Sequence, residues 1–537
     1  MPTSALQPPL SAGTSLPGLT ATAVAAADPV QPLRTDAACF AGRTRRGPLA
    51  SPVRVTDWAA YTAVFGGLDA ALDLPYAIRG FFVNGGSALW VVRLEPVGVT
   101  SAAAAWPAGA PSPYGPAAGC RVEAASPGGW ADGTRVTVRH RPGMIADGPH
   151  VLVRIDAPGE PPESFGWLPA AELPDAVAGL SRLVRLRPDG PAPADRAGAS
   201  HAGTQTTTLT GGTPAPGSPD DGETLARVYT NAVYAMADLP EPALLALPDL
   251  DRCGVGTAQR DVITDLLIEE CAIALDRLAL LDPPSSDAGA ADPAAATLYA
   301  ARWMDALRQR HGTAGLQACA VHWPPLRVSD PAASGGSSLR TMPASGHVAG
   351  VVARLDRERG AFATPANASL EDVVDLAHVL RPEQEAAVYA SGANLLRCLP
   401  GRGPLVWGGR TAVPQLRAGG VGDGWFIAHR RLVHRLVRAA RAVAEPLVFE
   451  PDTPGLRLLL VQGLTEVLLD LFEAGALAGA RPAQAFRVRC DEALNPPELA
   501  ALGQLVCQVE LAPAAPMEFI SVRLLMSPPD RLEVVEG

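Results

Sequence analysis

The sequence contains no lysine, so its 44 basic residues other than histidine are all arginines. A Walker A loop needs a lysine on the phosphates, and a Schiff base needs a lysine amine. Both kinds of chemistry are therefore excluded. A G-x-S-x-G nucleophile elbow and an H-E-x-x-H zinc motif are missing as well. The sequence predicts no catalytic, cofactor-binding or metal-binding residue, and we expect the chain not to be an enzyme.

Cysteine is scarce. The eight cysteines are scattered along the chain, and no two of them form a C-x-x-C pair. This spacing argues against a zinc ribbon and against a dense disulfide framework. We therefore expect buried free thiols in a reducing cytoplasm.

Signal-like and membrane-like segments are missing too. Residues 1–19 carry no positive charge and no continuous apolar run, unlike a signal peptide. The most apolar stretch, 458–477, is broken by acidic and polar residues and lacks the roughly 20 apolar residues of a membrane helix. We expect a chain made in the cytoplasm without direct membrane insertion. Its net charge of −11 argues against a broad nucleic-acid-binding surface.

What is present is a long globular sequence with 537 residues, of which 47% are hydrophobic. That length suggests about three domains. We predict an α/β (α+β) multidomain fold. Its expected parts are an extended N-terminal arm (1–35), the N-terminal part of a core domain (36–99), a β-rich insertion with flexible loops (100–222), an α/β middle domain (223–392), the C-terminal part of the core domain (393–515) and a C-terminal strand or arm (516–537).

The period of the apolar residues predicts individual elements. Alternation predicts short strands in the insertion at 121–124, 135–139 and 151–155. Helical spacing predicts helices at 346–355, 370–375, 424–444 and 454–476. Ser345 and His347 could be mistaken for a nucleophile and its base, but we interpret them as a Ser N-cap and a structural histidine at a helix start.

The predicted helix over 424–444 gathers arginines. Arg431, Arg435 and Arg438 follow i, i+4, i+7 spacing and share one face, and the helix also carries Arg430 and Arg441. In an acidic chain, such a face suits docking on an acidic protein surface. A solvated polar face with local ion pairs is the plain alternative, and nucleic acid is a third.

Many short motifs, in one shared order, resemble the phage tail sheath family. Early examples are FAGRTRRGP at 40–48, LPYAIRGFFVNGG at 74–86, ASPGGW at 125–130 and PASGHVAG at 343–350. The C-terminal half is the most specific, with motifs at 394–397, 400–403, 406–411, 430–432, 449–451, 475–480, 486–491 and 518–520. Together these motifs cover nearly the whole chain.

The resemblance implies a structural subunit of a contractile tail sheath, in which the parts 36–99 and 393–515 build the sheath core domain. Such subunits polymerise as stacked hexameric rings into a helical tube around an inner tube, and contract to drive the tube through a target envelope. The implied partners are further copies of the chain, the inner tube protein, baseplate and tail terminator components, and sheath paralogues, with no cofactor and no nucleic acid. The arginine helix would face the tube. We expect assembly in the cytoplasm, in a phage tail or a phage-tail-like particle that can be released.

The family's terminal arms add strands to a neighbour's sheet, which is a form of β-augmentation. The strand candidate at 519–526 and the tail at 531–535 fit this role, and the side chains that we expect at the contact are Phe519, Ile520, Val522, Leu524, Leu532 and Val534.

Two segments depart from the family pattern. Residues 17–23 lack the aromatic and acidic residues of the family's N-terminal arm, and 425–429 read WFIAH where the family often has an aromatic-rich Trp-Arg-Tyr run. A non-polymerising adaptor or cap, or a minor sheath paralogue, is therefore an alternative. An enzyme with a composite site in the α/β domain is a further one.

Overall fold

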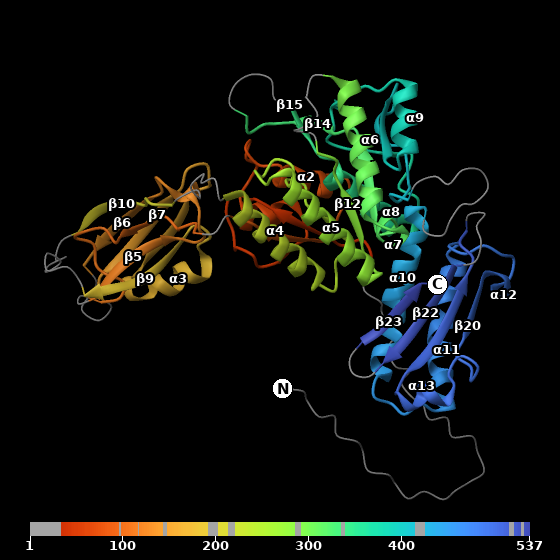
Figure 1. Ribbon diagram of the computed structural model, residues 1–537. Helices are drawn as coiled ribbons and strands as arrows, with labels where there is room; N and C mark the ends of the chain where they lie inside the picture. Colours follow the sequence, from red (N-terminus) through yellow and green to blue (C-terminus); the bar gives the residue numbers. More distant parts are fainter. Residues whose placement is uncertain are drawn as a thin grey trace, which may run out of the picture. The chain divides into compact units, whose positions relative to one another are not determined.

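The computed structural model describes residues 34–95, 98–115, 118–142, 148–191, 202–212, 221–284, 292–333, 339–413, 425–514, 520–527 and 531–536. The predicted N-terminal arm lies outside the described residues except for Arg34 and Thr35. The structure contains many helices and several separate sheets, which confirms the predicted multidomain α/β fold (Figure 1).

A nine-stranded sheet lies at the centre of the fold. Its strands, in sheet order, are β16 (Ala368–Ser369), β19 (Gly403–Val406), β18 (Asn394–Leu399), β13 (Cys319–Trp323), β12 (Leu278–Leu281), β11 (Leu244–Ala246), β1 (Ala38–Gly42), β3 (Leu89–Arg93) and β2 (Val53–Val55). The six strands from β18 to β3 are parallel, and the outer ones are antiparallel to their neighbours. Strands β1, β11, β12 and β13 are buried at every residue, as a parallel sheet covered on both faces requires.

Helices cover both faces of this sheet. Alternate residues of β1 therefore lie in two different hydrophobic cores. Cys39 and Ala41 share a core with α4 (Asp221–Ala237), α5 (Thr257–Ala274), α6 (Pro293–Arg310), α7 (Thr313–Gln317) and α9 (Pro382–Ala390). Ala38 and Phe40 share the opposite core with α1 (Trp58–Phe65), α2 (Leu74–Val83) and α8 (Ser345–Arg359). The period of two along the strand thus separates the two cores.

A small three-stranded sheet borders the second core. Its strands, in order, are β15 (Leu339–Met342), β14 (Leu326–Ser329) and β17 (Asp375–Leu376). The predicted helix at 370–375 is wrong, because this segment forms a turn that leads into β17. Asp372 has a φ of 61°, which a right-handed helix cannot accommodate. The backbone N–H of Glu371 donates instead to Asn84 Oδ1 at 2.8 Å.

The β-rich insertion contains two sheets. One is four-stranded, in the order β10 (Gly203–Thr208), β6 (Arg135–Arg141), β7 (His150–Asp156) and β8 (Glu163–Pro169). The other is three-stranded, in the order β4 (Ala103–Ala105), β5 (Ala118–Ala124) and β9 (Val184–Pro191), and the insertion also contains α3 (Leu173–Leu180). All three strands that alternation predicted here are confirmed as β5, β6 and β7.

The C-terminal part packs two long helices against an antiparallel sheet (Figure 1). The helices are α10 (Ile427–Ala444) and α11 (Pro454–Glu473), as predicted, and the short helices α12 (Pro482–Ala485) and α13 (Pro497–Ala501) follow them in the chain. The sheet order is β20 (Phe486–Arg489), β21 (Leu505–Leu511), β22 (Ile520–Ser527) and β23 (Arg531–Glu536). Strands β18 and β19, which the sequence assigned to this part, belong to the central sheet.

Helices α2 and α8 approach each other closely through glycines of the PASGHVAG motif. A Cβ atom added at Gly346 would lie 2.5 Å from the carbonyl oxygen of Ala77. A Cβ added at Gly350 would lie 2.4 Å from the carbonyl oxygen of Phe81. Both obstacles are backbone atoms, so the helices would have to separate. The motif is therefore explained by helix packing.

Replacing Gly350 with alanine is expected to lower the free energy of unfolding by about 1–3 kcal/mol, because overpacking outweighs the gain in helix propensity. Gly179 in α3 is the matched control, since a Cβ there meets nothing within 4 Å. Gly179→Ala should raise stability by about 0.5–1 kcal/mol. Denaturant unfolding measures both variants, and a stabilised Gly350→Ala protein would contradict the close-packing explanation.

Candidate assembly site

Three of the five arginines that the sequence assigned to a tube-facing surface are buried. The exposed fractions are 1% for Arg430 and 2% each for Arg431 and Arg438. Arg435 and Arg441 are half-buried. The exposed arginine face that the spacing predicted is therefore wrong for Arg430, Arg431 and Arg438. The physical reason is that α10 is packed on both sides.

The apolar side of α10 faces the C-terminal core, where Leu432, Leu436 and Val437 pack with α11 and β21. Its arginine side faces the central sheet. Arg438 donates from Nη1 to the carbonyl oxygens of Arg34 and Glu241, and from Nη2 to that of Pro242, all at 2.7 Å. Its Nε donates to the carbonyl oxygen of Asp276 at 3.2 Å.

These acceptors lie just before the first residues of β1, β11 and β12, which are neighbours in the sheet. One guanidinium therefore binds the amino ends of three parallel strands. Burial lowers the pKa of Arg438 to about 10, which still leaves the side chain charged at neutral pH. The charge is balanced by the carboxylate of Asp276, 3.8 Å from Arg438 Nε.

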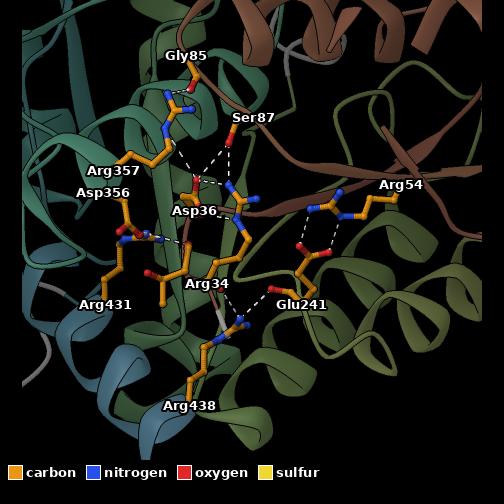
Figure 2. Close-up of polar contacts among 11 residues, drawn as sticks. Arg34, Asp36, Arg54, Gly85, Ser87, Glu241, Asp356, Arg357, Arg431 and Arg438 are labelled. Atoms are coloured by element: carbon orange, nitrogen blue, oxygen red, sulfur yellow. Dashed lines mark hydrogen bonds and ion pairs between the residues drawn. The ribbon is translucent and has the colours of Figure 1, made fainter. Parts of the chain in front are cut away.

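Arg431 holds the chain where the described residues begin. Its Nη2 donates to the carbonyl oxygen of Thr35 at 3.0 Å and also to the carboxylate of Asp356 on α8. Arg34 and Asp36, on either side of Thr35, form an ion pair with an Nε–Oδ1 distance of 2.6 Å. Figure 2 shows how these contacts converge on residues 34–36. We call residues 34–36 together with Arg431, Arg438 and Asp356 the arm-root cluster.

Ser87 and Arg357 also contact the arm-root cluster. The Oγ of Ser87 accepts a hydrogen bond from Arg34 Nη2 at 2.7 Å, and Arg357 lies 3.9 Å from the carboxylate of Asp36. Nearby, Glu241 accepts two hydrogen bonds from Arg54, at 2.8 and 2.9 Å (Figure 2). The path of the chain into β1 is thus fixed by charged groups from α8 and α10 and by the hydroxyl of Ser87 in the loop before β3.

His434 lies among the same arginines. Burial, and then the charges of Arg430, Arg431 and Arg438, lower its pKa well below the usual value. The neutral ring accepts a hydrogen bond from Arg430 Nε to its Nε2 at 3.1 Å. The histidine therefore serves as an uncharged acceptor inside a cationic cluster.

The topological switch point of the central sheet, where the strand order reverses, is occupied by a side chain of the protein itself. Strand β1 has β3 on one side and β11 on the other, and ligands of open α/β sheets bind outside the carboxyl ends of strands at such a point. Here the buried Asp249 carboxylate accepts hydrogen bonds from the backbone N–H of Arg43 and the hydroxyl of Tyr229, both at 2.6 Å. A Cβ at Gly42 would lie 2.5 Å from it. Burial raises the pKa of Asp249 to about 6.

A cavity of about 40 Å³ lies beside this position and includes Asp251, Arg260, Asp282 and Trp303 in its lining. That volume has room for a few water molecules. In the described residues, no group of three or more His, Cys, Asp and Glu side chains is arranged to hold a metal ion.

The start of α8 explains the Ser345–His347 motif. The predicted Ser N-cap is wrong, because the cap position is Ala344 and the capping oxygen comes from Asp282. Asp282 Oδ1 accepts hydrogen bonds from the N–H groups of Ala344 and Ser345, at 3.1 and 3.0 Å. His347 is 1% exposed, and its ring occupies the space that a side chain at Gly80 would need, which confirms a structural histidine.

The predicted C-terminal contact residues lie on β22 and β23, except for Phe519, which is outside the described residues. Strand β22 pairs along its length with β21, and β23 pairs with β22 with Leu524 opposite Val534. In this chain both strands complete their own sheet. Donation to a neighbour therefore stays a prediction, and β23 is the edge strand at which it would take place.

No helix in the described part of the chain is both long and apolar enough to cross a membrane. The fold and the filled switch point define a multidomain α/β protein whose polar clusters serve its own architecture.

Part of the chain is similar in sequence to phage tail sheath proteins. Residues 273–412 match the model of the phage tail sheath protein central domain. The tail sheath protein of Vibrio phage KVP40 is 26% identical over 196 residues, which are 36% of this chain and 27% of that protein. The match thus spans about a quarter of that relative. Both matches are to phage tail sheath proteins, and each covers only part of the chain.

Solved structures show the same fold over most of the chain. The sheath tail protein of Desulfitobacterium hafniense is similar over 95% of this chain and 100% of its own, with a TM-score of 0.60 and 13% identity. The sheath complex of an extracellular contractile injection system, in its contracted state, is similar over 94% of this chain and 96% of its own, with a TM-score of 0.53 and 16% identity.

Proposed function

We propose that this chain is a structural subunit of a contractile tail sheath. It polymerises helically, as stacked hexameric rings around an inner tube, and contracts to drive the tube through a target envelope. Its partners are further copies of itself, the tube protein, and components of the baseplate and tail terminator. Assembly takes place in the cytoplasm, in a phage tail or a phage-tail-like particle that can be released.

One observation carries this proposal: the tail sheath fold extends over nearly the whole chain, beyond the central domain that the family model matches. Two features of the described residues support it. The sheet of the C-terminal part ends in the edge strand β23, which can pair with a further strand. The arm-root cluster holds residues 34–36 with buried charged groups, so the position of the chain at these residues is fixed.

The filled switch point supports a structural role over a catalytic one. In an enzyme with this sheet topology, the position beside Gly42 would receive a ligand. Here a buried carboxylate with two hydrogen-bond donors occupies it. Docking of α10 on an acidic tube also remains a proposal, and it would rest on Arg435 and Arg441, because the other three arginines of the predicted face are buried.

Electron microscopy of the purified chain, alone and co-expressed with the products of neighbouring genes, tests the proposal. We expect striated tubes from the full chain. Deleting residues 531–537 removes the edge strand and should abolish the tubes, while circular dichroism shows the same helix content. Tubes of normal length from the deletion variant would contradict the role of β23.

A sheath-like adaptor, cap or minor paralogue is the second candidate, favoured by the departures at 17–23 and 425–429. It predicts discrete particles that bind a tail component under every condition and never form tubes. A composite-site enzyme predicts discrete particles with no affinity for tail components. Pull-down with the tube and baseplate proteins separates these two outcomes.

A further inference from the structure

Two cysteines face each other in the C-terminal sheet. Strands β20 and β21 are antiparallel, and Phe486 pairs with Leu511, Val488 with Val509, and Arg489 with Gln508. Continuing this register by one residue places Cys490 opposite Cys507. Directly opposed residues of such strands have Cα atoms about 4.5–5.5 Å apart. A disulfide needs a Cα separation of about 4.4–6.8 Å.

The two side chains also point to the same face. Residues two apart along a strand share a face, so Cys490 follows Phe486 and Val488, and Cys507 precedes Val509 and Leu511. All of these pack into one core with α11. Cys490 is 9% exposed and Cys507 is 3% exposed, and both are free thiols.

The thiols are close enough to alter each other. Hydrogen bonding with Cys507 lowers the pKa of Cys490, whereas the same contact raises the pKa of Cys507. Cys490 is also the more exposed of the two and lies just beyond the end of β20. It is therefore the thiol that a small oxidant would reach first as a thiolate. By contrast, burial raises the pKa of Cys253 to about 11 and that of Cys271 to about 12.

We propose that Cys490 and Cys507 are a modification site, which forms a cross-strand disulfide when the folded chain meets a low-molecular-weight disulfide. The Cys490 thiolate attacks one sulfur of the small disulfide and releases one small thiolate. The Cys507 sulfur then gives up its proton and attacks Sγ of Cys490, which releases the second small thiolate. The pair loses two electrons and two protons, and the small disulfide is reduced to two thiols.

The bond would close the loop that carries α13. That loop is already held by Asn495, whose Nδ2 donates to the carbonyl oxygen of Val506 at 2.9 Å and whose Oδ1 accepts from the N–H of Val506 at 2.6 Å. A covalent link between Cys490 and Cys507 would add to this clamp and restrict the unfolded chain. Strands β20 and β21 would then stay joined at this end while β22 and β23 keep their pairing.

The experiment uses the full chain with Cys398→Ser, because Cys398 is the exposed cysteine and would otherwise link molecules. The native protein is treated with oxidised glutathione, alkylated, and digested with trypsin. Both cysteines lie in one tryptic peptide, 490–523, since no arginine interrupts it. We expect this peptide to lose two hydrogens and to resist alkylation until dithiothreitol is added. Cys253 and Cys271 should become alkylated only after denaturation.

A rise of several degrees in the melting temperature of the oxidised protein should accompany the bond, and dithiothreitol should reverse it. Cys490→Ser and Cys507→Ser should each remove the rise. Free thiols at both positions, under conditions that fully oxidise Cys398 in the unsubstituted chain, would overturn the proposal. So would a glutathione adduct at Cys490 that never resolves. The test uses the isolated chain, so its failure would leave the sheath proposal untouched.

Discussion

Replacing Arg438 with methionine is expected to lower the free energy of unfolding by about 3–5 kcal/mol, as breaking a buried charge cluster typically does. Methionine fills part of the volume but donates no hydrogen bond. The carbonyl oxygens of Arg34, Glu241 and Pro242 would then lose a donor in a buried position. Each unsatisfied buried acceptor costs about 1–3 kcal/mol.

Asp276 is not the main source of this loss. Its carboxylate keeps Arg277 at 2.8 Å and Arg441 at 2.6 Å after Arg438 is removed. The cost therefore comes from the amino ends of β1, β11 and β12, which Arg438 joins. Hydrogen exchange of the amides in β1 should speed up in the variant, since the segment that leads into this strand loses its anchor.

Arg441→Met is the matched control on the same helix. Arg441 has a side chain that is 36% exposed and donates to Asp276 and to the carbonyl oxygen of Ala274. Water can replace part of these contacts, so we expect a loss of about 1 kcal/mol. Equal losses for the two variants in denaturant unfolding would show that the carbonyl contacts of Arg438 add little.

The sequence predicted individual helices and strands better than the contacts that their side chains make with distant segments. The alternating strands of the insertion and the two long C-terminal helices follow from local apolar patterns. The spacing of the arginines on α10 predicts one shared face, and in an acidic chain such a face suits an acidic partner. Their partners are backbone carbonyls and carboxylates from distant segments, such as Thr35 and Asp356, which no local pattern connects to α10.

The amphipathic pattern of α10 gave no warning of this burial, because its arginine side and its apolar side are as distinct as those of a helix solvated on one face. Asp249 and Asp282 were also missed, since each is a single acidic residue after a strand and only the sheet topology gives it a role.

The two buried ionisable groups at the start of α8 are expected to give opposite pH dependences of stability. Burial, and then the charge of Arg79, lowers the pKa of His347 to about 4. In the unfolded chain the ring takes up a proton near pH 6.5. The contribution of the neutral His347 ring to the free energy of unfolding is therefore fully present above pH 6.5 and is lost as the pH falls toward 4. Relative to His347→Gln, the native protein should lose about 1.4 kcal/mol per pH unit in that window.

Asp282 reverses the sign. Burial raises its pKa to about 7, although the N–H groups of Ala344 and Ser345 favour the charged form. The unfolded carboxyl titrates near pH 3.9. The contribution of the protonated Asp282 to the free energy of unfolding is thus fully present below the unfolded pKa. It is lost as the pH rises toward 7, again by about 1.4 kcal/mol per pH unit. Asp282→Asn keeps an oxygen acceptor for the helix start and removes the charge.

Denaturant unfolding at several pH values between 4 and 8 measures both effects as differences between each variant and the native chain. The difference for His347→Gln should be flat above pH 6.5 and should grow in favour of the variant below it. The difference for Asp282→Asn should grow in favour of the variant as the pH rises to about 7 and then level off. The two contributions have opposite signs, so they offset each other in the native chain between about pH 4 and 6.5. If the two variants gave parallel profiles of stability against pH, burial would not control the pKa values of His347 and Asp282. The start of α8 could then not be explained by a buried acid and a buried neutral histidine.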